Sequence, residues 1–161
     1  MTKKARIAVI GAGWWACHNY VPALLAHPEA ELVAVNRPDK EALERVTAHF
    51  GIARGYTETA EMLAGERPDG VVVASPHVLH FAHAMAGLDA GAHGLVDKPM
   101  TTSAADARAL VAKAGAVGRE LVVPYGWNFQ PYTTRARELV ALGAIGRIEH
   151  VVLQMASPLD D

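Results

Sequence analysis

Three residues near the N-terminus have the types and spacing of a phosphate-binding turn. An apolar run over residues 7–10 leads into Gly11, Gly13 and Ala16, which form a Gly-x-Gly-x-x-Ala pattern. Gly11 allows a tight turn, Gly13 lets the backbone approach a pyrophosphate, and Ala16 is small enough for a helix to pack on the strand. The N–H groups that open such a helix are unpaired and lie at the positive end of its dipole. The pattern predicts a dinucleotide site, and the alternative is a glycine turn without a ligand.

The residues after a second apolar run indicate which dinucleotide is favoured. NAD-binding domains usually carry an acid there, which accepts hydrogen bonds from the ribose hydroxyls, whereas this chain has Asn36 and Arg37. Asn36 lacks the charge that repels a 2′-phosphate, and Arg37 can bind that phosphate by a charge-assisted pair worth roughly 1.5–3 kcal/mol. We therefore expect NADP(H) in preference to NAD(H). Two alternatives stay open: Arg37 is a solvated loop residue, or Asp39 curls back to the ribose of NAD(H).

The elements that position these residues alternate along the chain. Strands are expected over residues 6–10, 31–35, 70–74, 93–96 and 120–123, with a loop or short strand over 51–56. Helices are expected over residues 14–26, 38–50, 78–90, 103–115 and 131–142, with a short one beginning at a Thr57 cap. Pro22 must end or kink the first helix, and Pro38 suits a first helical position. Such alternation implies βαβ units with right-handed crossovers, so the expected fold class is α/β with a Rossmann-type doubly wound parallel sheet.

The alternation stops near residue 124. Residues 125–161 are expected to form a linker, a helix and, over 148–155, the first strand of an incomplete C-terminal α+β domain. The expected division is therefore a dinucleotide-binding domain over residues 1–124 and the start of a substrate domain over 125–161. Because an unpaired strand tends to pair with another chain, homo-oligomers through residues 148–155 are also expected.

Composition and charge exclude several classes of protein. The chain has 161 residues, of which 51% are hydrophobic and 20% charged, as in a folded globular domain. A net charge of −2 without a basic block argues against nucleic acid as a partner. No apolar run has the length of a membrane span or a signal-peptide core. The single cysteine, Cys17, cannot form an internal disulfide, which fits a cytoplasmic protein. Cys17 is expected to pack, and the alternative is a reactive thiol at a helix N-terminus.

Three further segments carry polar residues beside predicted strands or helices. Residues 74–80 have the sequence Ala-Ser-Pro-His-Val-Leu-His, residues 97–100 have Asp-Lys-Pro-Met, and residues 125–130 have Tyr-Gly-Trp-Asn-Phe-Gln. Together with the glycine turn, these segments resemble the motifs of the glucose–fructose oxidoreductase and inositol dehydrogenase (Gfo/Idh/MocA) family. The Lys-Pro pair is the most specific of them, and the resemblance runs through essentially the whole chain.

The resemblance implies a two-domain oxidoreductase. Its Rossmann domain would bind a nicotinamide dinucleotide, and its second domain would cover a small sugar, inositol or related polyol, whose secondary alcohol or ketone exchanges a hydride with the cofactor. Lys98 is the implied catalytic residue, since a cation near the nicotinamide stabilises a developing alkoxide or assists a proton-transfer partner. Asp97 stands where the family usually has a glutamate, and Pro99 matches a proline that is often cis. The Asp and His of the family's second domain have no counterpart here, so the chain alone is expected to be catalytically incomplete.

The expected cofactor contacts come from the glycine turn and four other segments. They are Gly11, Ala12, Gly13, Trp14, Trp15, Asn36, Arg37, Ser75, Pro76, His80, Asp97, Lys98, Trp127 and Asn128. One of the adjacent tryptophans is expected to line the cofactor cleft and the other to pack, the alternative being that either is core. His80 matches a common family histidine, and its expected main role is to cap or pack its helix. His77 and His83 lie three residues to either side of it, but the three do not share one helix face, so no metal site is expected.

Three functions stay open from the sequence. The first is a nicotinamide-dependent dehydrogenase or reductase, or its cofactor-binding part, with no nucleic-acid or membrane partner. The second is a non-catalytic module that binds the dinucleotide without hydride transfer. The third is an inactive fragment that associates through residues 148–155.

Overall fold

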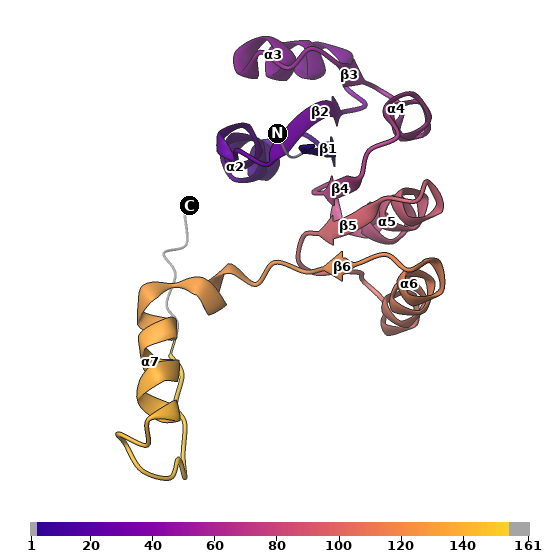
Figure 1. The fold of residues 1–161 in the computed structure, drawn as a ribbon. Coiled ribbons are helices and arrows are strands. Elements are labelled where there is room, and N and C mark those ends of the chain that lie inside the picture. The colour runs from indigo at the N-terminus through magenta and orange to yellow at the C-terminus, as the bar shows by residue number, and fades with distance from the viewer. Residues whose placement is uncertain (1–2, 155–161) are drawn as a thin grey trace. The chain divides into compact units, whose positions relative to one another are not determined.

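The computed structural model describes residues 3–154 of the chain. The chain divides into two compact units, residues 1–124 and residues 125–161. The first unit is built on a six-stranded parallel sheet with the strand order β3-β2-β1-β4-β5-β6 (Figure 1). This order reverses between β1 and β4, as in doubly wound Rossmann sheets, so the predicted fold class is confirmed.

The bounds of the elements in the first unit agree with the predicted alternation. The strands are β1 (Ala5–Ile10), β2 (Ala30–Asn36), β3 (Gly55–Tyr56), β4 (Gly70–Val73), β5 (His93–Val96) and β6 (Leu121–Val122). The helices are α1 (Trp14–His18), α2 (Tyr20–Ala26), α3 (Lys40–Phe50), α4 (Thr59–Glu66), the 3₁₀ turn η1 (His77–Leu79), α5 (His80–Asp89) and α6 (Ala104–Val117). Among residues 3–154, no helix is long and apolar enough to cross a membrane.

Helices cover both faces of the sheet (Figure 1). All four residues of β4 are buried, which is typical of a parallel strand covered on both sides. On one face, α1, α2 and α3 pack over Val9 and Val35. On the other face, α4, α5 and α6 pack over Ile10 and Val71. The sheet is therefore the middle of three layers.

The register of the sheet brings several loops to one edge. Ile10 pairs with both Asn36 and Val73, and Val73 pairs with Val96. Parallel strands end at the same side, so the loops that follow β1, β2, β4 and β5 are neighbours. These loops begin at Gly11, Arg37, Ala74 and Asp97.

The helical segment expected over residues 14–26 is interrupted, which confirms that Pro22 ends or kinks it, although the break lies three residues before the proline. The helix α1 ends at His18 and α2 begins at Tyr20, with Asn19 between them at φ −122° and ψ −61°. Pro22 then lies in the first turn of α2, where its missing N–H has no helical acceptor to lose. The break three residues earlier therefore moves the proline to a position that a helix tolerates.

Two helices begin later than predicted because the caps differ. At α3, the carboxylate of Asp39 accepts a hydrogen bond from the Ala42 N–H at 2.9 Å, so the helix begins after Asp39 rather than at Pro38. At α4, the helix begins at Thr59 with no side-chain cap bond, so the predicted cap at Thr57 does not form.

The second unit contains the 3₁₀ turn η2 (Gly126–Phe129) and the helix α7 (Pro131–Ala141). No residue of α7 is buried. Residues 148–154 form no strand, so the predicted terminal strand is wrong over these residues, and Met155 lies outside the described residues. A strand needs a hydrogen-bonded neighbour, and residues 125–154 supply none. Association through this segment therefore has no preformed strand to start from.

Candidate functional site

The glycine turn joins β1 to α1 beside the end of β4. Gly11 has a φ of +88°, and a Cβ there would lie 2.5 Å from the backbone of Ser75, so only glycine fits. The N–H groups of Gly11 and Ala12 both donate to the Asn36 carbonyl, at 3.1 and 2.8 Å. A Cβ on Gly13 would meet no heavy atom within 4 Å. The turn is therefore closed toward the sheet and open at Gly13, where a ligand can approach the backbone.

Asn36 is buried at the end of β2, where its amide stabilises the fold. Its Nδ2 donates to the carbonyls of Tyr56 and Thr57, both at 3.0 Å. Its Oδ1 accepts from the Thr59 hydroxyl at 3.2 Å. Both amide hydrogens are thus used, so Asn36 has no donor left for a phosphate. Asn36 therefore places a neutral side chain at the end of β2, where NAD-binding domains usually carry an acid.

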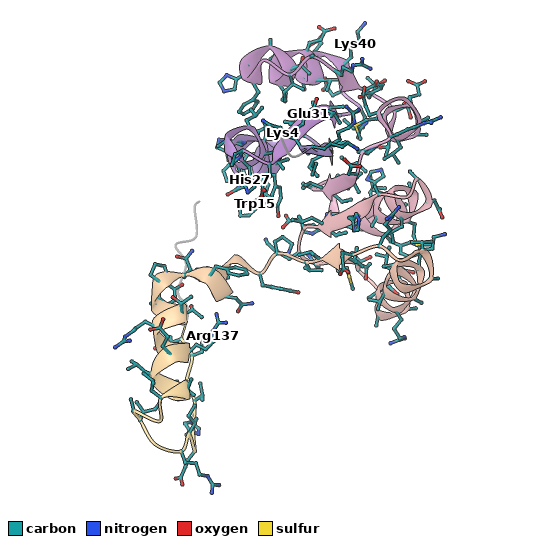
Figure 2. The ribbon with its side chains drawn as sticks, viewed as in Figure 1. Lys4, Trp15, His27, Glu31, Lys40 and Arg137 are labelled. Atoms are coloured by element: carbon teal, nitrogen blue, oxygen red, sulfur yellow. The ribbon has the colours of Figure 1, made fainter. Side chains whose placement is uncertain are left out.

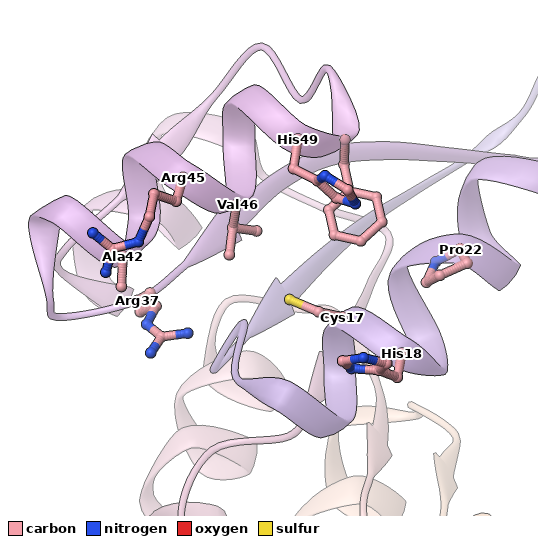
Figure 3. Close-up of a pocket in the computed structure, with 9 residues that line it drawn as sticks. Cys17, His18, Pro22, Arg37, Ala42, Arg45, Val46 and His49 are labelled. Carbon is pink, nitrogen blue, oxygen red and sulfur yellow. The ribbon is translucent and has the colours of Figure 1, made fainter.

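Arg37 is half-buried and bonded, so the solvated-loop alternative is wrong. Its N–H donates to the Tyr56 carbonyl at 3.0 Å, and its Nη1 donates to the Ala12 carbonyl at 2.9 Å. These bonds lay the guanidinium against the glycine turn. Arg37 also lines a cavity of about 720 Å³, together with Cys17, His18, Pro22, Ala42, Arg45, Val46, His49 and Phe50. Figure 3 shows Arg37 and Arg45 toward one end of this cavity and Pro22 at the other, so one end carries two positive charges.

Two residues near Arg37, Asp39 and Cys17, had open alternatives in the sequence, and the structure gives each a specific contact. Asp39 caps α3, where its Oδ1 accepts the Ala42 N–H, and a contact of its other oxygen with a ribose stays a prediction. The Cys17 Sγ lies 3.7 Å from the Ala12 carbonyl oxygen. Burial raises the pKa of the Cys17 thiol, and the Arg37 guanidinium offsets only part of this rise. The thiol therefore stays protonated, and the reactive-thiol alternative is disfavoured.

A second cavity, of about 260 Å³, lies where β1, β2, β3 and β4 end. Its lining residues are Gly11, Asn36, Pro38, Thr57, Glu58, Thr59, Ala60, Ser75, Pro76, Leu79 and His83. It brings together four of the predicted contact residues from three places in the chain: Gly11, Asn36, and the adjacent Ser75 and Pro76. Glu58, Leu79 and His83 were not predicted, although each follows a strand at the edge of the sheet where such ligands bind.

Lys98 and Asp97 follow β5 and lie against α1 and α2. The Lys98 Nζ is 5.2 Å from the centroid of the Trp15 ring, a cation–π contact. The Tyr20 hydroxyl donates to the Asp97 Oδ1 at 2.9 Å. Burial, together with the Asp97 carboxylate, raises the pKa of Tyr20 to about 12, so this phenol remains a donor. The peptide bond between Lys98 and Pro99 is cis. Three predicted residues are thus brought together: Trp15, Asp97 and Lys98.

Neither tryptophan of α1 belongs to the core. Their exposed fractions are 69% for Trp14 and 40% for Trp15. Figure 2 labels Trp15 on the side of the first unit that carries α2. The Trp14 ring lies 4.6 Å from the ring of His18, centroid to centroid. Because Ala16 is the buried residue of this five-residue helix, no tryptophan of α1 can pack on the sheet. The expectation that one of them packs is therefore wrong, and Trp15 is the one beside Lys98.

His80 is 1% exposed and lines neither cavity described above. Its Nδ1 lies 2.8 Å from the Pro99 carbonyl oxygen, and its Nε2 lies 2.8 Å from the Ser75 carbonyl oxygen. The Nδ1 of His83 lies 2.9 Å from the Ser75 hydroxyl. Burial lowers the pKa of His83, and the charge of His80 lowers it further. No three His, Cys, Asp or Glu side chains in residues 3–154 are grouped as metal ligands.

Trp127 and Asn128 lie in η2 of the second unit. Trp127 is exposed, and the Asn128 carbonyl accepts from the Arg137 Nη2 at 3.0 Å. Their contact with a cofactor stays a prediction.

Comparison with known proteins decides the family. The family model GFO_IDH_MocA, described as an oxidoreductase family with an NAD-binding Rossmann fold, matches residues 5–125. The chain belongs to the Gfo/Idh/MocA family. The matched residues include the glycine turn and the Lys98 loop, so this part is the family's NAD(P)-binding Rossmann domain.

Individual members of the Gfo/Idh/MocA family resemble the chain along most of its length. It is 30% identical to D-glucoside 3-dehydrogenase of Escherichia coli K12, over 89% of this chain and 41% of that protein. It is 34% identical to D-xylose 1-dehydrogenase (NADP(+)) of Hypocrea jecorina, over 78% of this chain and 33% of that protein.

A solved relative adds a bound cofactor to this comparison. The WlbA dehydrogenase of Bordetella pertussis, in complex with NADH and UDP-GlcNAcA, has a TM-score of 0.84 at 29% identity, over 90% of this chain and 44% of that chain. The chain thus spans about two fifths of the length of the relatives it matches. The name of the Hypocrea jecorina enzyme includes NADP(+), and the Bordetella pertussis dehydrogenase was solved with NADH.

Proposed function

We propose that this chain binds NADP(H) in preference to NAD(H), with NAD(H) as the weaker ligand. The observation that carries the preference is the Arg37 guanidinium, which lies on the glycine turn directly after a neutral Asn36. A 2′-phosphate at this end of the 720 Å³ cavity would meet Arg37 and Arg45. Arg45 is not locked elsewhere, since its ion pair with Glu41 spans 3.8 Å and both side chains are exposed.

The residues present fit a dinucleotide. Gly11 lets the turn pack against Ser75, and Gly13 leaves the backbone open to a pyrophosphate. The 260 Å³ cavity beside the turn is lined by loops after β1 to β4 and suits the adenosine end of the cofactor. The nicotinamide end would then lie toward Lys98, on the loop after β5.

The reaction we propose is hydride transfer to or from a secondary alcohol or ketone of a sugar, inositol or related polyol. The cofactor supplies the hydride chemistry when bound, and the chain binds and orients it. Lys98 would hold a positive charge near the reacting oxygen, where it stabilises a developing alkoxide. Its ammonium is placed by the Trp15 ring, and the neighbouring Asp97 is fixed by Tyr20. This activity belongs to the whole protein, because the chain spans only part of its relatives.

A second candidate is a module that binds the dinucleotide without catalysis. It would use the same glycine turn and the same Arg37 contact as the dehydrogenase. Saturable binding without turnover of any polyol would support it, and robust turnover by the purified chain would exclude it.

The cofactor preference is tested with Arg37→Ala. Calorimetric titration should show NADPH binding the wild-type chain more tightly than NADH. Removal of a charge-assisted contact should weaken NADPH binding by roughly ten- to hundredfold and leave NADH binding nearly unchanged. Arg108→Ala, at an exposed position of α6, is the matched control and should change neither. Tighter NADH binding by the wild type, or equal losses for both cofactors in Arg37→Ala, would contradict the preference.

A further inference from the structure

We propose that His80 acts as a doubly protonated ring that clamps together the two cofactor-facing loops after β4 and β5. The proposal rests on the proposed function for its effect on cofactor binding. His80 is 1% exposed and begins α5, behind both loops. One ring nitrogen faces the Ser75 carbonyl and the other faces the Pro99 carbonyl, each at 2.8 Å. It is therefore placed as a positioning residue, since it bonds the backbone of the protein rather than lining the cofactor cavities.

The two carbonyl oxygens that face the His80 ring determine how many of its nitrogens must carry a proton. Carbonyl oxygens only accept hydrogen bonds, and a neutral imidazole has a single N–H. A neutral His80 could therefore bond Ser75 or Pro99, and its other nitrogen would turn a lone pair toward an oxygen 2.8 Å away. Only the ring with both N–H groups makes both bonds. These bonds are charge-assisted, and each is about twice as strong as a neutral one.

Among residues 3–154, the titratable groups around the His80 ring do not include a carboxylate bonded to it, so the two carbonyl oxygens are its main stabilising partners. From η1, the His77 ring packs edge-on against His80 with centroids 5.4 Å apart. From α5, His83 has its pKa lowered, first by burial and then by the charge of His80. The loop that carries Pro99 also carries Asp97 and Lys98, and the Asp97 carboxylate is bonded to the Tyr20 hydroxyl. None of the described contacts pairs the His80 ring with a carboxylate, so the bonds to the Ser75 and Pro99 oxygens have to offset the cost of burying its charge.

The clamp completes a closed series of contacts around the cofactor site. The Ser75 backbone packs against Gly11, closely enough that a Cβ on Gly11 would lie 2.5 Å from it. On the other side, Pro99 follows Lys98, whose ammonium lies over the ring of Trp15, just after the glycine turn. His80 joins these two halves. Loss of either bond would remove this link between the Ser75 loop and the Lys98 loop, beyond the point where the Asp97 N–H bonds the Val73 carbonyl.

The protonation of the ring is tested without any cofactor. Long-range ¹H–¹⁵N spectra of the cofactor-free chain, with the His80 signals assigned by loss in His80→Gln, should show protons on both ring nitrogens at the pH used for titrations. His77→Gln, a change at the exposed neighbour, should leave these signals in place. A His80 ring with one N–H at that pH would overturn the proposal whatever the chain binds. If His80→Gln fails to fold, the signals that disappear in His77→Gln and His83→Gln identify those two rings, and the His80 signals are then assigned among the ones that remain.

The effect on cofactor binding is tested by calorimetry with NADPH. His80→Gln should weaken binding roughly ten- to hundredfold, as expected for loss of a charge-assisted bond, and His77→Gln should not. Binding by a folded His80→Gln that is as tight as binding by the wild type overturns the clamp. No NADPH binding at all, with both ring protons present, overturns the proposed function and leaves the clamp supported by the spectra.

Discussion

A Gly11→Ala variant is expected to lose about 2–5 kcal/mol of folding free energy. Two costs add. The φ of +88° lies in the left-handed region, which costs a residue with a Cβ about 1–2 kcal/mol. The added Cβ would also lie 2.5 Å from the Ser75 Cα and N and 2.9 Å from the Ala74 carbonyl carbon, so backbone must move. Overpacking of this kind typically costs about 1–3 kcal/mol.

Denaturant unfolding of Gly11→Ala measures this loss, and Gly51→Ala separates its two parts. Gly51 also has a positive φ, of +66°, but a Cβ there would meet no heavy atom within 4 Å. Gly51→Ala should therefore lose only the conformational cost of about 1–2 kcal/mol. Equal losses in the two variants would mean that the contact between the glycine turn and the Ser75 loop is absent in solution.

Removal of the buried carboxylate by Glu66→Ala is expected to cost about 2–4 kcal/mol. The Glu66 side chain is 4% exposed, and its oxygens accept from Tyr56 at 2.7 Å, Arg54 at 3.0 Å and Arg6 at 3.3 Å. Breaking a fully buried ion pair costs about 3–5 kcal/mol because a charge is left uncompensated. Here Arg54 and Arg6 are partly exposed, so water takes up some of that cost. Urea unfolding checks the value, with Glu44→Ala, on the exposed surface of α3, as the control that loses little.

The same carboxylate makes stability depend on acid. Burial raises the pKa of Glu66, but the Tyr56 hydrogen bond and the two guanidiniums outweigh it, so the pKa lies below its ordinary value of 4.5. A lowered pKa contributes stability that is complete above the unfolded value and is lost as the pH falls through the folded one. At pH values below 4.5, the urea concentration at the unfolding midpoint should therefore decrease with falling pH more steeply for the wild type than for Glu66→Gln. Parallel curves for the two proteins would rule out this role for Glu66.

The sheet could be predicted because its signals are local. The apolar run of β4 and the glycine turn after β1 each indicate their structure within a few residues. The break at Asn19 could not be predicted in position, because Pro22 demands a break without fixing its place. The expected terminal strand is absent over residues 148–154 because an apolar pattern does not supply the neighbour that a strand needs.

The sequence could predict which residues lie at the candidate site, but it could not predict most of the contacts that they make. The sequence indicated Arg37 as the cation after β2, but its bond to the Ala12 carbonyl joins residues 25 positions apart. The sequence indicated Asn36 as a cofactor contact, which stays a prediction, but not the bonds of its amide to the backbone 20 and 21 residues later. The two carbonyl partners of His80 lie on separate loops. Each of these roles depends on the strand order, which sets which loops meet.

The central claim, that the glycine turn binds a nicotinamide dinucleotide, is tested most directly by titrating NADPH into the wild-type chain and into Gly13→Val. Gly13 has an ordinary φ of −85° and open space around its Cβ position, so this variant should fold as the wild type does. Its side chain would occupy the space through which a pyrophosphate reaches the backbone. We predict saturable one-to-one binding by the wild type and none by the folded variant. Equal binding by both, or no binding by the wild type, would contradict the claim.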